Sequence, residues 1–325
     1  MEDYAIIAKT PGGPEVMEVV PHSIHAPGPG ETLVRHTAVG LNFLDVYHRS
    51  GQYPWPEGNG IIPGSEAAGI VEAVGEGVTT VKPGDRVAYT YPMGAYVTAR
   101  VIGADHLLKL PDGVSDETAA GALLKGLTAH YLIHDTFVVR KGMTVLVQAA
   151  AGGVGLLMGQ WLKAKGVRAI GTAGGPDKVA LAQAHGYHAV IDYRSEDFAA
   201  RVQDLTDGAG VDAVYDSVGQ DTWRGSMACL RTHGALVVFG QSSGAITDFS
   251  LGDLATGSFH LCRPVLFHYI ATPQALQARG AALFAALDDR TLTSEVRNRF
   301  ALKYAARAHR ALEARETTGT TVLIP

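Results

Sequence analysis

The chain has 325 residues, which is more than one domain usually needs, and each half is long enough to bury a hydrophobic core. Apolar residues make up 46% and charged residues 18%, with 39 glycines and 15 prolines, a composition that excludes a disordered chain and favours a compact α/β protein. The formal net charge of -5 provides no broad positive field, so general binding to nucleic acid or to anionic membranes is disfavoured.

The first ten residues, MEDYAIIAKT, lack the basic start and apolar run of a secretory signal. No stretch reaches the ~20 consecutive apolar residues that span a bilayer. Cys229 and Cys262 are the two cysteines, too few for a disulfide framework, and we expect them to be small buried side chains. The sequence therefore predicts a cytoplasmic protein without a membrane segment.

The first 125 residues are dense in glycine and proline, with short β-branched runs at 32–38, 70–74 and 86–89, which predict a mainly β domain. The segment GLNFLDVYHRSGQYPWP, residues 40–56, breaks both the helical and the strand period. Its amide, phenol and aromatic groups suit the lip of a pocket for a planar carbonyl compound. An aromatic turn that packs the domain core explains the same composition equally well.

Residues 127–262 alternate apolar runs with helical stretches, which is typical of repeated βα units and a parallel sheet. The expected strands cover residues 144–147, 168–172, 189–192, 211–216 and 235–239. The expected helices cover residues 156–165, 178–185, 196–205 and 222–230, the third with Ser195 as its N-cap. Beyond them, 273–288 and 305–315 look helical, and the β-branched run 320–324 is expected to rejoin the first domain.

The strongest motif is VLVQAAAGGVGLLMGQWLKAKG, in which a buried-type strand enters a small-residue turn and then a helix. Gly152 and Gly153 would let the backbone approach a pyrophosphate, and Gly155 would allow close packing of helix against strand. Ala150 stands where the common GxGxxG pattern begins with glycine. The motif with its βα context predicts a dinucleotide site.

The end of the next strand indicates which dinucleotide binds. NAD-binding folds usually place an acid there against the ribose 2'-hydroxyl, but residues 170–175 read IGTAGG and leave room for a 2'-phosphate. Lys178 and Tyr193 could converge on that phosphate, which favours NADP(H). Asp177 is the counter-evidence, and Lys178 taken alone is equally typical of a solvated helix lysine.

Metal-ligating residues do not form a zinc pattern in this sequence. Zinc sites take three or four Cys, His or carboxylate ligands at close spacing, whereas the 13 histidines are scattered and no cysteine pair is present. Glu66 in GSEAAG is the one carboxylate in a suggestive glycine-rich setting. We expect it to hydrogen-bond within the structure rather than to bind metal.

Many of these segments together resemble the quinone oxidoreductases of the zinc-independent branch of the medium-chain dehydrogenases/reductases. The matching stretches, in chain order, are GGPEVMEV, GLNFLDVYHRSGQYP, PGSEAAGIVEAVGEGV, KPGDRVAY, LLKGLTAHYL, AAAGGVG, GTAGGPDK, VIDYRSEDF, VYDSVG, VVFGQSSG and TTVLIP. The resemblance implies a GroES-like substrate domain at 1–126 and 263–325, a Rossmann NADPH-binding domain at 127–262, and a homodimer.

The resemblance also implies roles for individual residues. On the quinone and nicotinamide side it places Asn42, Tyr47, Tyr53 and Thr128. At the pyrophosphate it places Gly152, Gly153 and Val154, and around the 2'-phosphate Gly174, Lys178, Tyr193 and Arg315. At the ribose and nicotinamide it places Ser217, Phe239, Gly240 and Phe267.

The function implied is hydride transfer from NADPH to a quinone without a metal, with Asn42 and Tyr47 positioning the acceptor carbonyl. Reduction of an activated double bond in an enal or enone shares the fold and the cofactor, so it is the nearest alternative. An NADPH-binding protein that interacts with RNA is a second alternative, which the acidic balance disfavours.

Overall fold

The computed structural model describes residues 3–56, 58 and 60–325. The chain divides into two compact units, residues 1–125 with 270–325, and residues 126–269. The sequence analysis placed these boundaries at 126/127 and 262/263. Helix α2 (Asp116–Tyr131) begins in the first unit and continues into the second.

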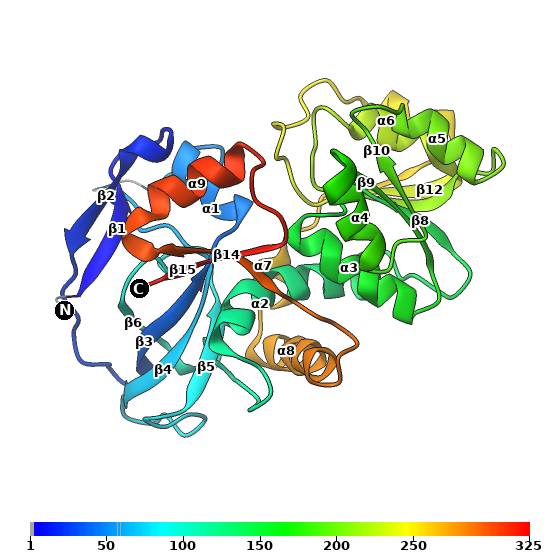
Figure 1. Ribbon diagram of the computed structural model, residues 1–325. Coiled ribbons are helices and arrows are strands. Elements are labelled where there is room, and N and C mark those ends of the chain that lie inside the picture. Colours follow the sequence, from blue (N-terminus) through cyan, green and yellow to red (C-terminus); the bar gives the residue numbers. More distant parts are fainter. Residues whose placement is uncertain (1–2, 57, 59) are drawn as a thin grey trace. The chain divides into compact units, whose positions relative to one another are not determined.

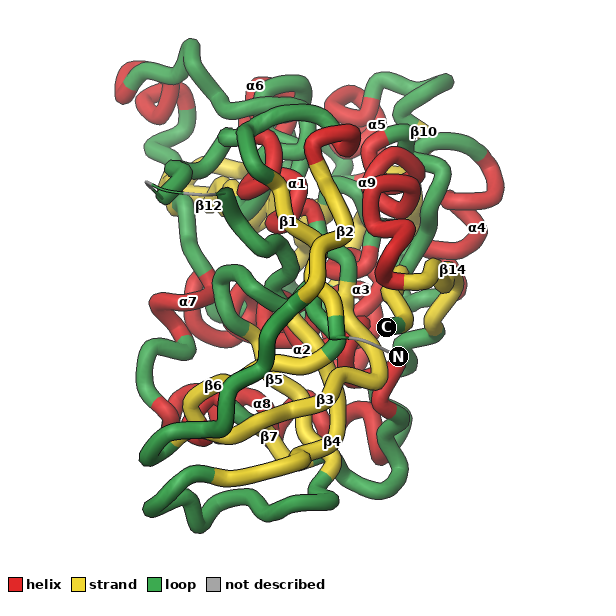
Figure 2. Tube along the Cα trace, turned by 90° about the vertical axis from the view of Figure 1, so that its left-hand side faces the viewer, coloured by secondary structure: helices red, strands yellow, loops and turns green. Residues whose placement is uncertain are grey.

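The first unit is built on a mixed sheet to which both ends of the chain contribute (Figures 1 and 2). Its strands follow the order β14-β15-β3-β4-β5-β7, with β6 also paired to β3. They are β3 (Glu31–Gly40), β4 (Glu66–Val74), β5 (Arg86–Thr90), β6 (Ala99–Gly103), β7 (Leu108–Lys109), β14 (Val296–Ala301) and β15 (Thr320–Ile324). β15 pairs antiparallel with β3, so the prediction that the C-terminal strand rejoins the first domain is confirmed.

Helices and a separate two-stranded ribbon complete this unit. The ribbon is β1 (Tyr4–Ala8) with β2 (Met17–Pro21), and the helices are α1 (Phe43–Ser50), α8 (Pro273–Asp288) and α9 (Ala305–Glu313). The core joins Val34, Val71 and Tyr89 of the sheet to Leu302 and Ala305 near the C-terminus. Burial of apolar side chains from both ends of the chain explains why the two segments form one unit.

Residues 43–50 form a helix, so the expectation that this segment lacks helical periodicity is wrong. The reason lies in its inner face, which carries Asp45 and Arg49 as well as Val46 and Tyr47, all buried. A search for apolar residues at helical spacing overlooks a helix whose buried side chains are partly charged. Gly51 ends the helix at a φ of 79°, a left-handed conformation that glycine adopts without strain.

The second unit contains a six-stranded parallel sheet in the order β10-β9-β8-β11-β12-β13. Its strands are β8 (Thr144–Val147), β9 (Arg168–Ala173), β10 (Ala189–Asp192), β11 (Val211–Asp216), β12 (Leu230–Val238) and β13 (His260–Cys262). Relabelled from β8 as the first strand, the order is the 3-2-1-4-5-6 arrangement of dinucleotide-binding folds. The Rossmann prediction is therefore confirmed.

The helices between these strands are α3 (Gly153–Ala164), α4 (Pro176–Ala184), α5 (Phe198–Leu205) and α6 (Trp223–Ala228), and α7 (Leu266–Tyr269) follows β13. α3 packs on α4 and α5 on α6, and right-handed crossovers put the two pairs on opposite faces of the sheet (Figure 1). Asp197, not the expected Ser195, caps α5, because its carboxylate accepts from the amides of Ala199 and Ala200.

Strands covered on both faces need apolar side chains on both, which explains the unbroken runs that the sequence showed. Leu146, Ile170, Val214 and Leu236 are buried in one cluster in this sheet. The sequence analysis missed β13, a strand of three residues at the sheet edge with two of its side chains exposed. Among the described residues, no helix combines the length and the apolar character needed to cross a membrane.

Candidate active site

Three of the predicted acceptor-side residues lie on helix α1 or directly beside it. Asn42 is the N-cap, and its backbone amide donates to Asp45 Oδ2 at 2.9 Å in a capping box. Tyr47 lies one turn further along, with its ring centre 5.5 Å from that of Tyr53. The backbone amide of Tyr53 donates to the Tyr47 carbonyl at 3.2 Å, which holds the chain after the helix against it. The structure therefore brings Asn42, Tyr47 and Tyr53 together around one short helix.

Asp45 anchors the start of α1 from within the core. Besides the Asn42 amide, it accepts the Ser65 hydroxyl at 2.7 Å and the Tyr96 phenol at 3.1 Å. Burial nevertheless raises the pKa of Asp45 to about 7, and these three hydrogen bonds oppose the shift. The carboxyl group thus titrates near neutral pH in the folded protein.

The titration of Asp45 predicts a pH dependence of stability. The pKa of Asp45 in the folded protein lies above its ordinary value of 3.8. Its protonated carboxyl group therefore contributes fully to the free energy of unfolding below about pH 4, and this contribution is lost as the pH rises through 7. The Asp45→Asn side chain does not titrate, so the variant should lose up to about 4 kcal/mol of this dependence between about pH 4 and 7. Urea unfolding of both proteins across that range measures it. An unchanged slope in the variant would show that Asp45 is ionised throughout.

A chain of hydrogen bonds continues from Tyr96 to the C-terminal helix. Arg49 donates to both carboxylate oxygens of Glu313 at 2.8 Å and to His309 Nδ1 at 3.1 Å. Since a guanidinium can only donate, His309 Nδ1 is the acceptor and its Nε2–H donates to the Tyr96 oxygen, 2.9 Å away. Burial lowers the pKa of His309 to about 3, so this imidazole is neutral. The network joins α1 to α9.

Glu66, the first residue of β4, is fully buried beside Asn42. Its Oε1 accepts from Asn42 Nδ2 and from Lys125 Nζ, both at 2.8 Å, and its Oε2 accepts the Leu124 amide at 2.6 Å. The prediction that Glu66 hydrogen-bonds within the structure is confirmed. The sequence analysis missed Lys125 as its partner, because the two are 59 residues apart.

The turn between β8 and α3 has the form that a dinucleotide site requires. Gly152 is the N-cap of α3 and is exposed to solvent. The first amides of a helix have no acceptor within the helix, so those that follow Gly152 can donate to a ligand. A Cβ on Gly155 would lie 2.6 Å from the carbonyl oxygens of Ala149 and Ala150. Ala150 replaces the first glycine of the pattern, and its side chain fits because Gly171 of β9 has none.

The 2'-phosphate candidates of this unit gather after β9. A Cβ on Gly174 would lie 2.5 Å from the Tyr193 hydroxyl and 3.2 Å from Arg194 Nε, so both side chains lie over this glycine. Asp192 holds the two loops together, since its Oδ1 accepts from the amides of Gly175 at 2.9 Å and Arg194 at 3.0 Å. The sequence analysis missed Arg194, a cation directly after Tyr193 in the quoted VIDYRSEDF.

Lys178 lies in the first turn of α4, two residues after its first residue, and is partly buried. Arg315, the fourth residue predicted for the 2'-phosphate, belongs to the first unit. It follows α9, is exposed, and has a left-handed φ of 60°. Gly174, Lys178 and Tyr193 are thus grouped within one unit, and Arg315 is part of the other.

Three of the ribose and nicotinamide candidates, Ser217, Phe239 and Gly240, directly follow the carboxyl ends of β11 and β12. A Cβ on Gly240 would meet the Ser217 carbonyl oxygen at 2.6 Å, so the two backbones are in contact. The Phe239 amide donates to the Asp216 carbonyl at 2.8 Å. Thr128, on α2, is buried, and Phe267, on α7, is partly exposed. Ligands of open parallel sheets bind at this edge.

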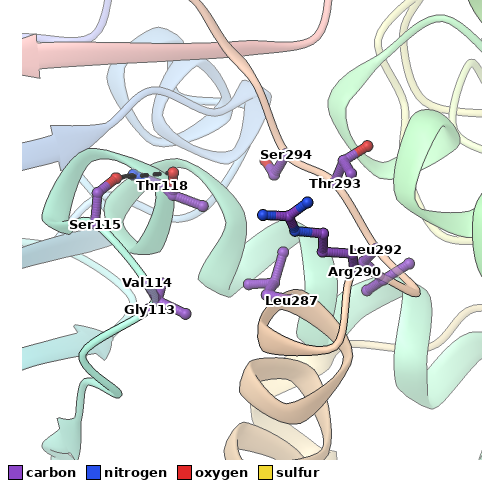
Figure 3. A pocket seen from close by; sticks show the side chains of 9 residues that line it. All are labelled: Gly113, Val114, Ser115, Thr118, Leu287, Arg290, Leu292, Thr293 and Ser294. Atoms are coloured by element: carbon purple, nitrogen blue, oxygen red, sulfur yellow. Dashed lines mark hydrogen bonds between the residues drawn. The ribbon is translucent and has the colours of Figure 1, made fainter.

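A pocket of about 370 Å³ lies in the first unit, between the start of α2 and the end of α8 (Figure 3). Ser115, Thr118, Arg290 and Ser294 line it, and Figure 3 shows the Arg290 guanidinium directed toward Ser294. None of the predicted site residues lines this pocket.

The sequence matches two protein families. Residues 28–145 match the alcohol dehydrogenase GroES-like domain, and residues 153–279 match the family described as zinc-binding dehydrogenase. Within residues 3–56, 58 and 60–325, no group of three or more His, Cys, Asp or Glu side chains is arranged to hold a metal ion.

Relatives match over almost the whole chain. A quinone oxidoreductase of Pseudomonas aeruginosa is 50% identical over 317 residues, with 97% of each chain covered. The 2-haloacrylate reductase of a Burkholderia species is 40% identical over 328 residues, covering 99% of this chain and 98% of that protein. The structure of Escherichia coli quinone oxidoreductase complexed with NADPH matches with a TM-score of 0.96 and 43% identity, covering 99% of this chain and 100% of that one.

The GroES-like unit and the Rossmann unit with its glycine-rich turn define a reductase of the medium-chain dehydrogenase/reductase class. Within that class, the chain belongs to the quinone oxidoreductase family.

Proposed function

We propose that the protein reduces quinones with NADPH as the hydride donor. The observation that carries this proposal is the glycine-rich turn at the carboxyl edge of the parallel sheet. Gly152 at the start of α3 is exposed, and a Cβ at Gly155 or Gly174 would collide with neighbouring atoms of the protein, so only glycine permits this close approach of the backbone. That edge fits a dinucleotide, and the small residues after β9 fit a 2'-phosphate. The family relationship, including a relative complexed with NADPH, supports the same cofactor and acceptor.

In this proposal the second unit binds the nucleotide. The amides of Gly152, Gly153 and Val154 bind the pyrophosphate at the start of α3. The residues proposed around the 2'-phosphate are Gly174, Lys178, Tyr193 and Arg194 of this unit, and the family resemblance assigns Arg315 of the first unit to the same phosphate. Those around the ribose and nicotinamide are Ser217, Phe239, Gly240 and Phe267.

In the first unit, the proposed acceptor residues are Asn42, Tyr47 and Tyr53, and the family resemblance assigns the same role to Thr128 of the second unit. When bound, NADPH supplies the hydride. The Asn42 amide and the Tyr47 phenol orient the acceptor carbonyl and stabilise the charge that develops on its oxygen. The hydroquinone anion delocalises its charge and takes its proton from water, so no strong general acid is needed in this scheme. A homodimer, as the family resemblance implies, and a location in the cytoplasm complete the proposal.

A second candidate function is reduction of an activated carbon-carbon double bond. The 40% identity to a 2-haloacrylate reductase over 328 residues favours keeping it. Oxidation of NADPH and NADH by the wild-type protein with 1,4-benzoquinone, 1,2-naphthoquinone and 2-hexenal separates the two. Quinone turnover with NADPH is the expected result, and turnover of the enal alone would replace our proposal with the second candidate.

The NADPH preference should depend on Lys178 and Arg194. Each Lys178→Ala or Arg194→Ala substitution removes one cation from the 2'-phosphate, which is worth about 1.5–3 kcal/mol and should raise the Kd for NADPH roughly ten- to hundred-fold. The Kd for NADH should stay within about twofold, because NADH lacks this phosphate. Lys163→Ala, on the exposed end of α3, is the matched control. Equal losses for both nucleotides would place the two cations elsewhere.

A further inference from the structure

The carboxylate of Glu66 is completely enclosed near the acceptor side. It is 0% exposed, and Lys125, its ion-pair partner, is 6% exposed. A buried carboxylate without partners is very costly, whereas here both oxygens accept hydrogen bonds, two on Oε1 and one on Oε2. This compensation accounts for the presence of a charged group in the interior.

The fold provides space for this carboxylate. Gly40 ends β3, and a Cβ there would collide with Glu66 Oε1 and with the carbonyl of Ala120 on α2. Glu66 therefore lies where β3, β4 and α2 come so close that a side chain at position 40 has no room. The backbone around the carboxylate, and not the side chain alone, determines its position.

The position of Glu66 determines the direction of the Asn42 amide. Asn42 Nδ2 gives one N–H to Glu66 Oε1, and because an amide group is planar, the direction of its second N–H is then determined too. The assignment of nitrogen rather than oxygen to this contact follows from chemistry, since a carboxylate can only accept. Asn42 thus has a donor left for a ligand oxygen.

Lys125 has a separate electrostatic effect. Asn42 Nδ2 and Lys125 Nζ bind the same oxygen, each at 2.8 Å, so the two nitrogens are separated by at most twice that distance. An uncompensated carboxylate so near Asn42 would repel the negative charge that forms on a reduced carbonyl. The ammonium of Lys125 cancels that repulsion.

We propose that Glu66 is a positioning residue of the acceptor site, which orients the Asn42 amide toward the acceptor carbonyl, and that Lys125 is its counter-ion. This inference rests on the proposed function. In the reaction the hydride and its electron pair add to the quinone, which is reduced while NADPH is oxidised to NADP⁺. The second N–H of Asn42 stabilises the resulting oxyanion, and a proton from water then yields the hydroquinone.

The kinetic test is a double-mutant cycle on Glu66→Leu, which removes the acceptor of the Asn42 N–H, and Asn42→Ala, with 1,4-benzoquinone. Each single variant should lower kcat roughly ten- to hundred-fold, and the NADPH KM should stay within about twofold. If Glu66 acts through Asn42, the double variant should be no slower than Asn42→Ala alone. Additive losses would overturn the positioning role.

Charge rescue tests Lys125 and guards against a variant that fails to fold. Lys125→Met leaves the carboxylate without its counter-ion, so its kcat should fall more than that of Glu66→Gln. The Glu66→Gln/Lys125→Met protein keeps an oxygen for Asn42 and no charge, so it should recover most of the lost kcat. A double variant slower than both single variants would exclude the counter-ion role.

A spectroscopic measurement separates this inference from the proposed function. The side-chain NH₂ signals of Asn42 in the ¹H–¹⁵N spectrum, identified by their loss in Asn42→Ala, should shift in Glu66→Gln and in Glu66→Gln/Lys125→Met. The spectra are recorded without substrate, so they do not depend on activity. If the Asn42 signals shift in the Glu66 variants but the wild-type protein reduces no quinone, the proposed function alone is contradicted. An unshifted amide in an active enzyme would contradict the positioning role alone.

Discussion

Gly155→Ala should destabilise the second unit by about 1–3 kcal/mol, or more if the backbone must move, although alanine normally favours a helix over glycine. The added Cβ would lie 2.6 Å from two carbonyl oxygens and 2.8 Å from the Ala150 carbonyl carbon. These are backbone atoms of the turn where we propose that the pyrophosphate binds, so they cannot rotate away as a side chain would. Displacement of the turn should also raise the Kd for NADPH at least tenfold.

Gly152→Ala should have the opposite profile. Its Cβ would meet the Ala149 carbonyl oxygen at 3.1 Å, and the residue is exposed with an ordinary φ of -77°, so stability should change by less than about 1 kcal/mol. The same Cβ would occupy the space where we propose that the pyrophosphate binds. NADPH affinity should therefore fall roughly tenfold or more, which corresponds to about 1.4 kcal/mol.

Thermal unfolding and NADPH titration of both variants test this pair of expectations. Gly252→Ala is a suitable control, because the residue is exposed and its Cβ would meet only the Ser250 hydroxyl oxygen, at 3.4 Å. A Gly155→Ala protein with wild-type stability would show that the turn can adapt. A Gly152→Ala protein with wild-type affinity would remove the pyrophosphate from this position.

The sequence predicted the second unit well because its signals are local. The strands at 144–147 and 189–192 have the bounds observed, since runs of buried apolar residues between turns are contiguous in the chain. The observed helix α4 begins at Pro176, two residues before the predicted start, because proline is well suited to the first turn of a helix. The motif turn and its glycines are equally local.

Features that depend on distant partners could not be predicted in the same way. Helix α1 was overlooked because the partner of its buried Arg49 is 264 residues away. The pairing of Lys125 with Glu66 was missed because it joins different elements. The sequence shows that Arg194 directly follows Tyr193. It does not show that the carboxylate of Asp192 binds the backbone amides of both Arg194 and Gly175. Buried charges of this kind are recognised only when the fold shows both partners.

Arg49→Ala should lower the free energy of unfolding of the first unit by about 1–3 kcal/mol, because it removes a buried guanidinium that donates hydrogen bonds to three acceptors. Arg49 is 1% exposed, and its loss would leave Glu313, His309 Nδ1 and the Gly12 carbonyl without their shared donor. Arg35→Ala is the matched control: Arg35 also contacts two carboxylates, but its side chain is 43% exposed, so the expected loss is under about 1 kcal/mol. Urea unfolding measures both variants. Similar losses would mean that burial adds little to the Arg49 network, and α1 would then owe its position to apolar packing instead.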